Sequence, residues 1–143
     1  MHVSFAILSE YVIEARDGKL SIVGIFDEIQ AFQVPATFPR IFATIRIQGR
    51  ITDGTEHIVR LVIVDEDGHE IVKKSPALPF SLKPRGPGVP MHAVVVADLR
   101  EVEFPRFGDY EFNIFIDDEP TPAESVAFTV IRIDTKDVDG ESG

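Results

Sequence analysis

Hydrophobic and polar residues alternate with a period of two over most of this chain. The segment RIFATIRIQ, residues 40–48, places an apolar residue at every second position, and DYEFNIFID, residues 109–117, repeats the pattern. Alternation of this kind is typical of a strand with one face toward a core and the other toward water. No window keeps a helical period beyond two turns. The pattern therefore predicts an all-β chain.

Other segments add strands and the turns between them. HIVRLVIVD (57–65) and MHAVVVADL (91–99) are rich in valine and isoleucine and alternate less cleanly, as central strands covered on both faces do. Asp17-Gly18 and Asp67-Gly68 lie between apolar segments and are strong hairpin signals. SVAFTVIRI, from Ser125, reads as the last strand. We predict about eight strands in a two-layer antiparallel β-sandwich, immunoglobulin-like in type.

The stretch EFPRFGDYEF, residues 103–112, carries a candidate corner of the sandwich. In immunoglobulin-like domains, a tyrosine near the start of a late strand bonds its hydroxyl to backbone a few residues upstream. Tyr110 follows Gly108 and begins an alternating strand, so we assign it this structural role rather than a catalytic one. Because the chain has no cysteine and no tryptophan, it is immunoglobulin-like at most.

Length and termini indicate one domain. With 143 residues, the chain can bury a core without disulfides or metal. We expect residues 1–133 to form the sandwich and the acidic segment 134–143 to be disordered. The only uninterrupted apolar run near the N-terminus is residues 5–8, too short for a signal peptide or a membrane span. We therefore expect a cytoplasmic protein.

The charge balance disfavours two classes of partner. The net charge is −10, from 24 acidic residues against 14 lysines and arginines. A protein that binds duplex nucleic acid needs a positive face to displace counterions from phosphate, and an anionic membrane surface makes the same demand. We expect neither nucleic acid nor membrane as a partner.

The acidic segment VDEDGHEIVKK raises the possibility of calcium. Aligned on Gly68, it offers Asp65 and Asp67 as ligands of an EF-hand loop. Ile63 and Lys74 then occupy the first and last ligand positions, so two required carboxylates are missing. The acidic run 117–119 also lacks a full ligand set. We interpret both as turns and expect no metal.

Other catalytic signals are missing from the sequence. The four histidines are scattered without metal-site spacing, and no nucleophile elbow, phosphate-binding loop or dinucleotide fingerprint occurs. We expect no cofactor and no enzyme activity. Carboxylate-based catalysis stays open as a less favoured alternative, because sequence does not reveal which acidic residues face each other.

One basic segment contrasts with the acidic chain. From Lys73 to Arg85 there are four cations and no acid, and residues 75–90 hold five of the ten prolines. Prolines exclude a central strand, so we expect an edge crossing or loop with a short strand around residues 80–82. Lysines and prolines can protect an edge from stray pairing. The same segment can instead dock a partner or a second copy of the chain, with these candidate residues: Lys73, Lys74, Phe80, Leu82, Lys83 and Arg85.

This segment leads to the favoured functional prediction. We expect a non-catalytic protein-interaction or assembly module that acts through an edge strand or loop end, with a protein partner or self-association. The alternative is a small-ligand or carbohydrate-binding sandwich, which the count of two tyrosines and no tryptophan disfavours because sugars stack on such rings.

Three motifs together resemble a family of small, uncharacterised bacterial all-β proteins. They are the hairpin DGKL followed by Gly24 and the pair Phe26-Asp27, the turn VDEDG, and the strand FPRFGDYEF. The resemblance extends to about Arg132 and leaves the proline-rich basic segment and the tail without a counterpart. It implies no assigned activity and no catalytic residues.

Overall fold

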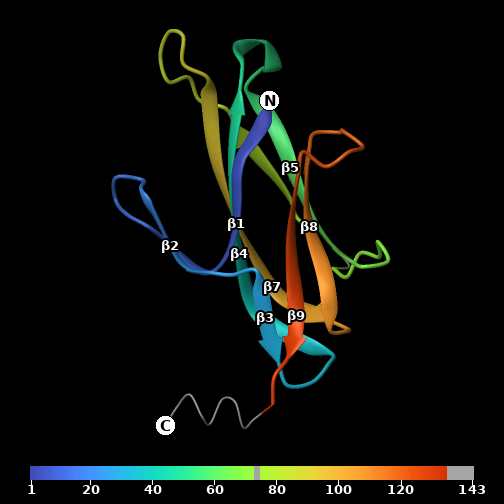
Figure 1. Ribbon diagram of the computed structural model, residues 1–143. Coiled ribbons are helices and arrows are strands. Elements are labelled where there is room, and N and C mark those ends of the chain that lie inside the picture. Colours follow the sequence, from blue (N-terminus) through green and yellow to red (C-terminus); the bar gives the residue numbers. More distant parts are fainter. Residues whose placement is uncertain (73–74, 135–143) are drawn as a thin grey trace.

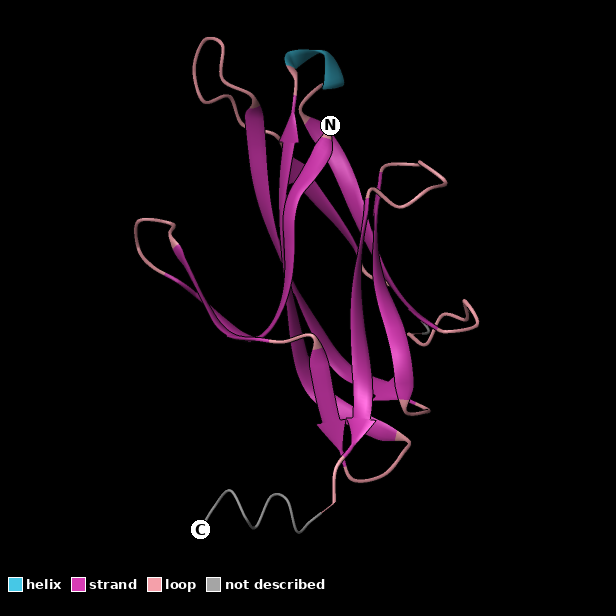
Figure 2. Ribbon diagram, in the orientation of Figure 1, coloured by secondary structure: helices cyan, strands magenta, loops and turns pink. Residues whose placement is uncertain are grey.

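The computed structural model describes residues 1–72 and 75–134, and it confirms an all-β fold. Figures 1 and 2 show long strands in two layers. Within these ranges, no helix is long and apolar enough to cross a membrane. The elements are β1 (His2–Glu14), β2 (Leu20–Ile25), β3 (Glu28–Ala31), β4 (Ala36–Gly49), the 3-10 turn η1 (Ile51–Asp53), β5 (Glu56–Asp65), β6 (Ala77–Ser81), β7 (Met91–Phe104), β8 (Gly108–Ile116) and β9 (Glu124–Arg132).

The strands form two sheets that pack face to face. The first has the order β2-β1-β4-β7 and the second β3-β9-β8-β5-β6. The pairs are antiparallel except β3 and β9, which run parallel. This one pair corrects the prediction of a purely antiparallel sandwich. It arises because the chain leaves the first sheet after β2 and joins the second sheet alongside its last strand.

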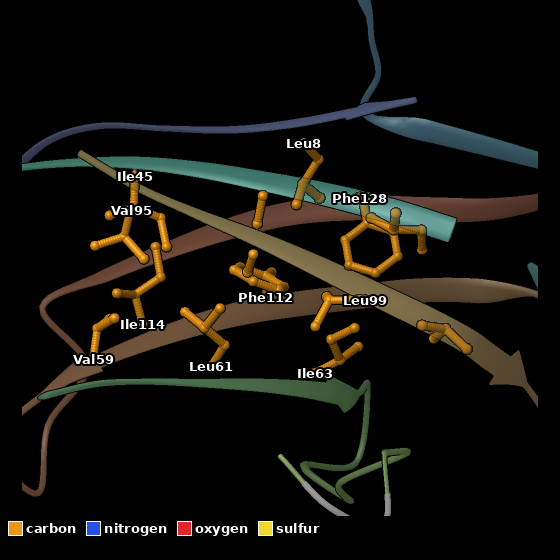
Figure 3. Close-up of a cluster of buried hydrophobic side chains, with 14 of the residues drawn as sticks. Leu8, Ile45, Val59, Leu61, Ile63, Val95, Leu99, Phe112, Ile114 and Phe128 are labelled. Carbon is orange, nitrogen blue, oxygen red and sulfur yellow. The ribbon is translucent and has the colours of Figure 1, made fainter. Parts of the chain in front are cut away.

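The core lies between the sheets, where the inward residues of each alternating strand meet. Figure 3 shows Ile45 and Val95 of the first sheet directed toward Ile114 of the second. Phe104 and Phe112 are among the largest fully buried side chains. The period-two pattern therefore predicted the inward faces correctly.

The position of β7 differs from the prediction. Its sequence was interpreted as a central strand, but β4 is its one partner strand in the described ranges, and apart from a single bridge between His92 and Lys83 its other side forms the edge of the first sheet. Val94 and Val96 point outward and are 44% and 38% exposed. A valine-rich segment indicates that both faces of a strand carry apolar side chains. It does not indicate how many strands pair with it, because that depends on the rest of the chain. The β5 segment does lie inside its sheet, between β8 and β6.

The β1–β2 hairpin projects from the body of the sandwich as an arm (Figure 1). Pairing of β1 with β4 ends at Ser9, and the rest of β1 pairs with β2 alone. At the tip, the Gly18 N–H donates to the Ala15 carbonyl at 2.9 Å, and Gly18 has φ +85. Because Asp17 keeps a negative φ, the turn is type I followed by a left-handed glycine, not a two-residue primed turn.

Candidate functional site

The predicted corner at Tyr110 is confirmed. Its hydroxyl donates to the Arg106 carbonyl at 2.6 Å and accepts from the Arg106 N–H at 3.3 Å. The side chain is 2% exposed, and its ring stacks on Phe128 and meets Phe104 edge-on. Burial raises the pKa of Tyr110, so the phenol stays protonated. Tyr110 holds the turn between β7 and β8.

The acidic turn considered for calcium is bound by an arginine. Asp65, Asp67 and His69 bring possible ligand atoms within 4.8 Å of one another. The Arg106 guanidinium, however, donates to Asp65 at 2.9 Å and to Asp67 at 3.3 Å. Backbone N–H groups of His69 and Asp67 also donate to Asp65, and the bond from His69 contributes most to lowering the pKa of Asp65. The carboxylates of Asp65 and Asp67 therefore accept hydrogen bonds from groups of the same chain.

A buried histidine and an aspartate form a pair that sequence reasoning missed. His57 Nδ1 lies 2.7 Å from Asp117 Oδ2, and His57 Nε2 lies 3.0 Å from the Gly54 carbonyl. Asp117 also accepts from the Ile58 N–H at 3.0 Å and has φ +54. The two residues are 60 positions apart, so no local motif could reveal them.

The hydrogen-bond acceptors around His57 favour its protonated form. Burial lowers the pKa of His57, but the bonds to Asp117 and Gly54 outweigh it, and the net pKa is raised. Burial raises the pKa of Asp117, and its bonds to His57 and Ile58 reverse this to a net lowering. A protonated imidazole satisfies both acceptors. Because both ring nitrogens of His57 face protein acceptors, this pair fastens the loop before β5 to the end of β8 and presents no free base.

The predicted basic segment divides into three parts. Lys73 and Lys74 lie outside the described residues. Phe80 and Leu82 are only 8% and 1% exposed and belong to the core, so their predicted role as anchors for a partner is wrong. Their alternation directs both side chains inward at the rim of the sandwich, where Phe80 stacks on the His57 ring. The expected edge strand is confirmed as β6.

The other two candidates, Lys83 and Arg85, belong to a cluster of positive charge that we call the basic end. Lys83 N donates to the His92 carbonyl at 2.9 Å, and His92 N donates to the Lys83 carbonyl at 3.2 Å. Burial lowers the pKa of His92, and the positive charges of Arg85, Arg46 and Lys83 lower it further. Arg46, on β4, was not anticipated because it is distant in sequence. The basic end lies near the N-terminus and η1 (Figure 1).

Several side chains of the basic end lack polar partners in the described part of the chain. Over residues 1–72 and 75–134, the three cations Arg46, Lys83 and Arg85 make no ion pair. His92 Nδ1 is buried without a hydrogen-bond partner, as is Thr44 Oγ1 on the neighbouring strand. His92 lies at the start of β7, and Thr44 lies opposite Val96, four residues further along, so the unmatched groups border residues 92–96 of β7.

The free edge of β7 adds backbone groups to this region. The bonds between His92 and Lys83 show that the N–H and C=O of His92 point away from β4. In an antiparallel strand every second residue points the same way, so the N–H and C=O of Val94 and Val96 also face outward. No group in the described part of the chain bonds to them. An open groove of about 1120 Å³ runs beside residues 93–96, with Phe5 and Pro79 on its walls.

The other sheet edges carry protective features that residues 93–97 of β7 lack. β6 has five residues and contains Pro79, β3 has four residues and begins at Glu28, and β2 bends at Gly24 with φ +71. Short length, proline, charge and bends all discourage strand pairing. β7 has no charge, proline or positive φ from residue 93 to residue 97. It is the most open edge of the sheets in the described ranges.

Comparison with known proteins identifies a family but no activity. A family model described as a family of unknown function (DUF6941) matches residues 4–131. The chain belongs to this family. The match confirms the resemblance seen in the hairpin, turn and corner motifs. No curated protein matches the chain.

One solved structure has a related shape. It is the Pseudomonas fluorescens alkylpurine DNA glycosylase AlkC, bound to DNA containing an abasic site analog. The similarity covers 90% of this chain and 30% of that chain, with 14% sequence identity and a TM-score of 0.42. The chain thus spans under a third of that protein, and a likeness at this level supports no functional argument.

Proposed function

We propose that this domain is a non-catalytic protein-interaction or assembly module whose β7 edge receives an extended segment of another chain. The observation that supports this proposal is the open edge of β7. There the outward N–H and C=O groups of Val94 and Val96 face a groove instead of a neighbouring strand. A segment that adds to a sheet edge gains main-chain hydrogen bonds along its length.

The surroundings of the edge favour an extended segment with acidic residues. Val94 and Val96 offer apolar side chains on the outer face, with Phe5 of β1 beside them in the same groove. The cations of the basic end, which make no ion pair within residues 1–72 and 75–134, attract a negatively charged segment and orient it, in a chain whose net charge is −10. This charge balance still disfavours nucleic acid and anionic membranes as partners. A cysteine-free chain fits a reducing cytoplasm, which we propose as its location.

The groove also favours the alternative of a small-ligand-binding sandwich. Thr44 Oγ1 and His92 Nδ1 have no partner beside it, and a ligand with donor and acceptor groups would find them near an apolar wall. A thermal-shift screen against small organic anions and sugars distinguishes a ligand-binding domain from a protein-interaction module. A ligand that raises the melting temperature of the parent, and less that of Thr44→Val, supports the alternative.

We also infer that the domain is related to immunoglobulin-like sandwiches. The hydroxyl of Tyr110 bonds to backbone four residues upstream at the start of β8, as the corner tyrosine does in that architecture. The face-to-face packing of the two sheets supports the same relation.

The proposed function is tested by removing one outward N–H. Proline at position 94 deletes a donor that points away from β4, so the ladder between β4 and β7 remains. Val94→Thr is the matched control, because it keeps the N–H and the branched shape. We expect affinity capture from native cells, followed by mass measurement of the intact assembly, to recover a partner with the parent and the threonine variant but not with the proline variant.

A second blocking variant guards against misfolding. Val96→Lys places a charge in the middle of the edge while leaving every backbone bond in place. Circular dichroism and the melting temperature establish that each variant is folded. If folded Val94→Pro and Val96→Lys recover the same assembly as the parent, the β7 edge is not the binding surface and the proposal is wrong.

A further inference from the structure

We propose that the segment received by the β7 edge is the β7 strand of a second copy of this chain, paired in the antiparallel direction. This inference rests on the proposed function and names its partner. Pairing of the two β7 strands would join the first sheets of two copies into one continuous sheet. It would also give each copy the strand neighbour that its own fold leaves out.

The argument begins with the charges at the two ends of β7. Its start adjoins the basic end, where Lys83 and Arg85 are exposed and make no ion pair over the described residues. Its far end carries Glu101 and Glu103, which are also exposed and unpaired within the same ranges. Arg100 at the same end is paired with Asp98. The charges that make no ion pair in the described ranges are therefore positive at one end of β7 and negative at the other.

This charge pattern complements itself in only one direction. An antiparallel pair places the positive end of each β7 beside the negative end of the other, so the favourable contact occurs twice. A parallel pair would place like charges together at both ends. An unrelated acidic segment would account for the basic end but not for the acidic one.

The backbone of β7 defines the length that can pair. The outward side of His92 is already bonded to Lys83, so a new strand begins to pair at Val94. Glu101 has φ +53, which interrupts the regular strand after Arg100. The free segment is therefore 94–100.

If residues 94–100 of the two copies pair along their whole length in the antiparallel direction, the register follows. It sets Val94 opposite Arg100 of the second copy and Val96 opposite Asp98 of the second copy. Both positions are ones whose backbone groups point outward, as pairing requires. In the same register the strand beyond position 100 of the second copy passes the basic end, which brings its two glutamates toward Lys83 and Arg85.

A charge exchange tests this arrangement. In the first variant, Lys83→Glu and Arg85→Glu make both ends of β7 negative. In the second, Glu101→Lys and Glu103→Lys make both ends positive. The matched control, Arg16→Glu with Lys19→Glu on the tip of the arm, changes the net charge as the first variant does but leaves β7 intact.

Sedimentation equilibrium at several concentrations gives the dissociation constant of each protein. We expect the parent and the arm control to form dimers, and each β7 variant alone to associate at least about tenfold more weakly. An equimolar mixture of the two β7 variants should restore dimers, because every end then meets an end of opposite charge.

Three outcomes would overturn the proposal: a parent that stays monomeric at all concentrations, β7 variants that associate like the parent, or a mixture that restores nothing. The failure of the broader function can be told apart. If the parent is monomeric but captures another protein that Val94→Pro does not, the edge still binds and only the identity of its partner is wrong. If Val94→Pro captures the same assembly, the edge function fails as well.

Discussion

The two ends of β7 differ in how well the molecule satisfies its own polar groups. Beyond the far end, the Tyr110 hydroxyl pairs with Arg106, and the Arg106 guanidinium bonds Asp65 and Asp67. Along the first half of β7, His92 Nδ1 and Thr44 Oγ1 are buried without hydrogen-bond partners in residues 1–72 and 75–134, and Arg46, Lys83 and Arg85 make no ion pair in these ranges. The corner at the far end serves stability. The groups along the first half of β7 have no such partners in the described part of the chain.

This difference has an energetic reason. A buried polar group without a hydrogen bond costs about 1–3 kcal/mol, and a fold retains such a cost where another requirement acts on the same residues. Side-chain packing between the sheets does not depend on the outward face of β7. The chain can therefore leave that face open without losing its core.

The largest expected effect comes from removing one hydroxyl in each region: that of Tyr110 beyond the far end of β7, and that of Thr44, which lies opposite Val96. Tyr110→Phe removes the hydroxyl that donates to the Arg106 carbonyl, and we expect the free energy of unfolding to fall by about 1–2 kcal/mol. Thr44→Val removes a hydroxyl that has no partner, so we expect no loss and up to about 1 kcal/mol of gain. Urea denaturation of both variants measures the comparison. Equal losses for the two would mean that the ends do not differ in this way.

A smaller effect is the pH dependence of stability, to which His57 and His92 contribute in opposite directions. The folded pKa of His57 lies above its unfolded value near 6.5, so its stabilising contribution is complete below that value and is lost as pH rises through the folded pKa. The folded pKa of His92 is lowered, so its effect is the reverse: stability is lost as pH falls below the unfolded value. NMR titration should place the two histidines on opposite sides of about 6.5.

Asp117→Asn measures how much the charged bond between Asp117 and His57 contributes to stability. Asparagine keeps an acceptor for the Ile58 N–H and tolerates the positive φ, but it removes the charge that faces His57. We expect a loss of about 1 kcal/mol at pH 6, at the low end for a charged hydrogen bond because Asp117 is 42% exposed. The loss should shrink as pH rises and His57 deprotonates. A loss that is constant with pH would contradict the charged state of His57.

Local sequence patterns predicted the parts of this fold that depend on near neighbours. Alternation located β4 and β8, valine and isoleucine content located β5 and β7, and glycine and tyrosine spacing located the turns and the corner at Tyr110. The edge position of β7 escaped prediction because a strand does not encode how many neighbours it has. The His57–Asp117 pair and the addition of Arg46 to the basic end escaped because they join residues distant in sequence. Charge counting found Lys83 and Arg85, but it could not show that Phe80 faces the core.

Amide hydrogen exchange along β7 tests most directly whether this edge pairs with another strand. Ala93 and Val95 bond to β4 and should exchange slowly at every protein concentration, whereas Val94 and Val96 should exchange quickly in dilute solution. As concentration rises, we expect the amides of Val94 and Val96 to become protected while amides near Tyr110 do not change. Rapid exchange of Val94 and Val96 at every concentration, and in any assembly captured from native cells, would contradict it.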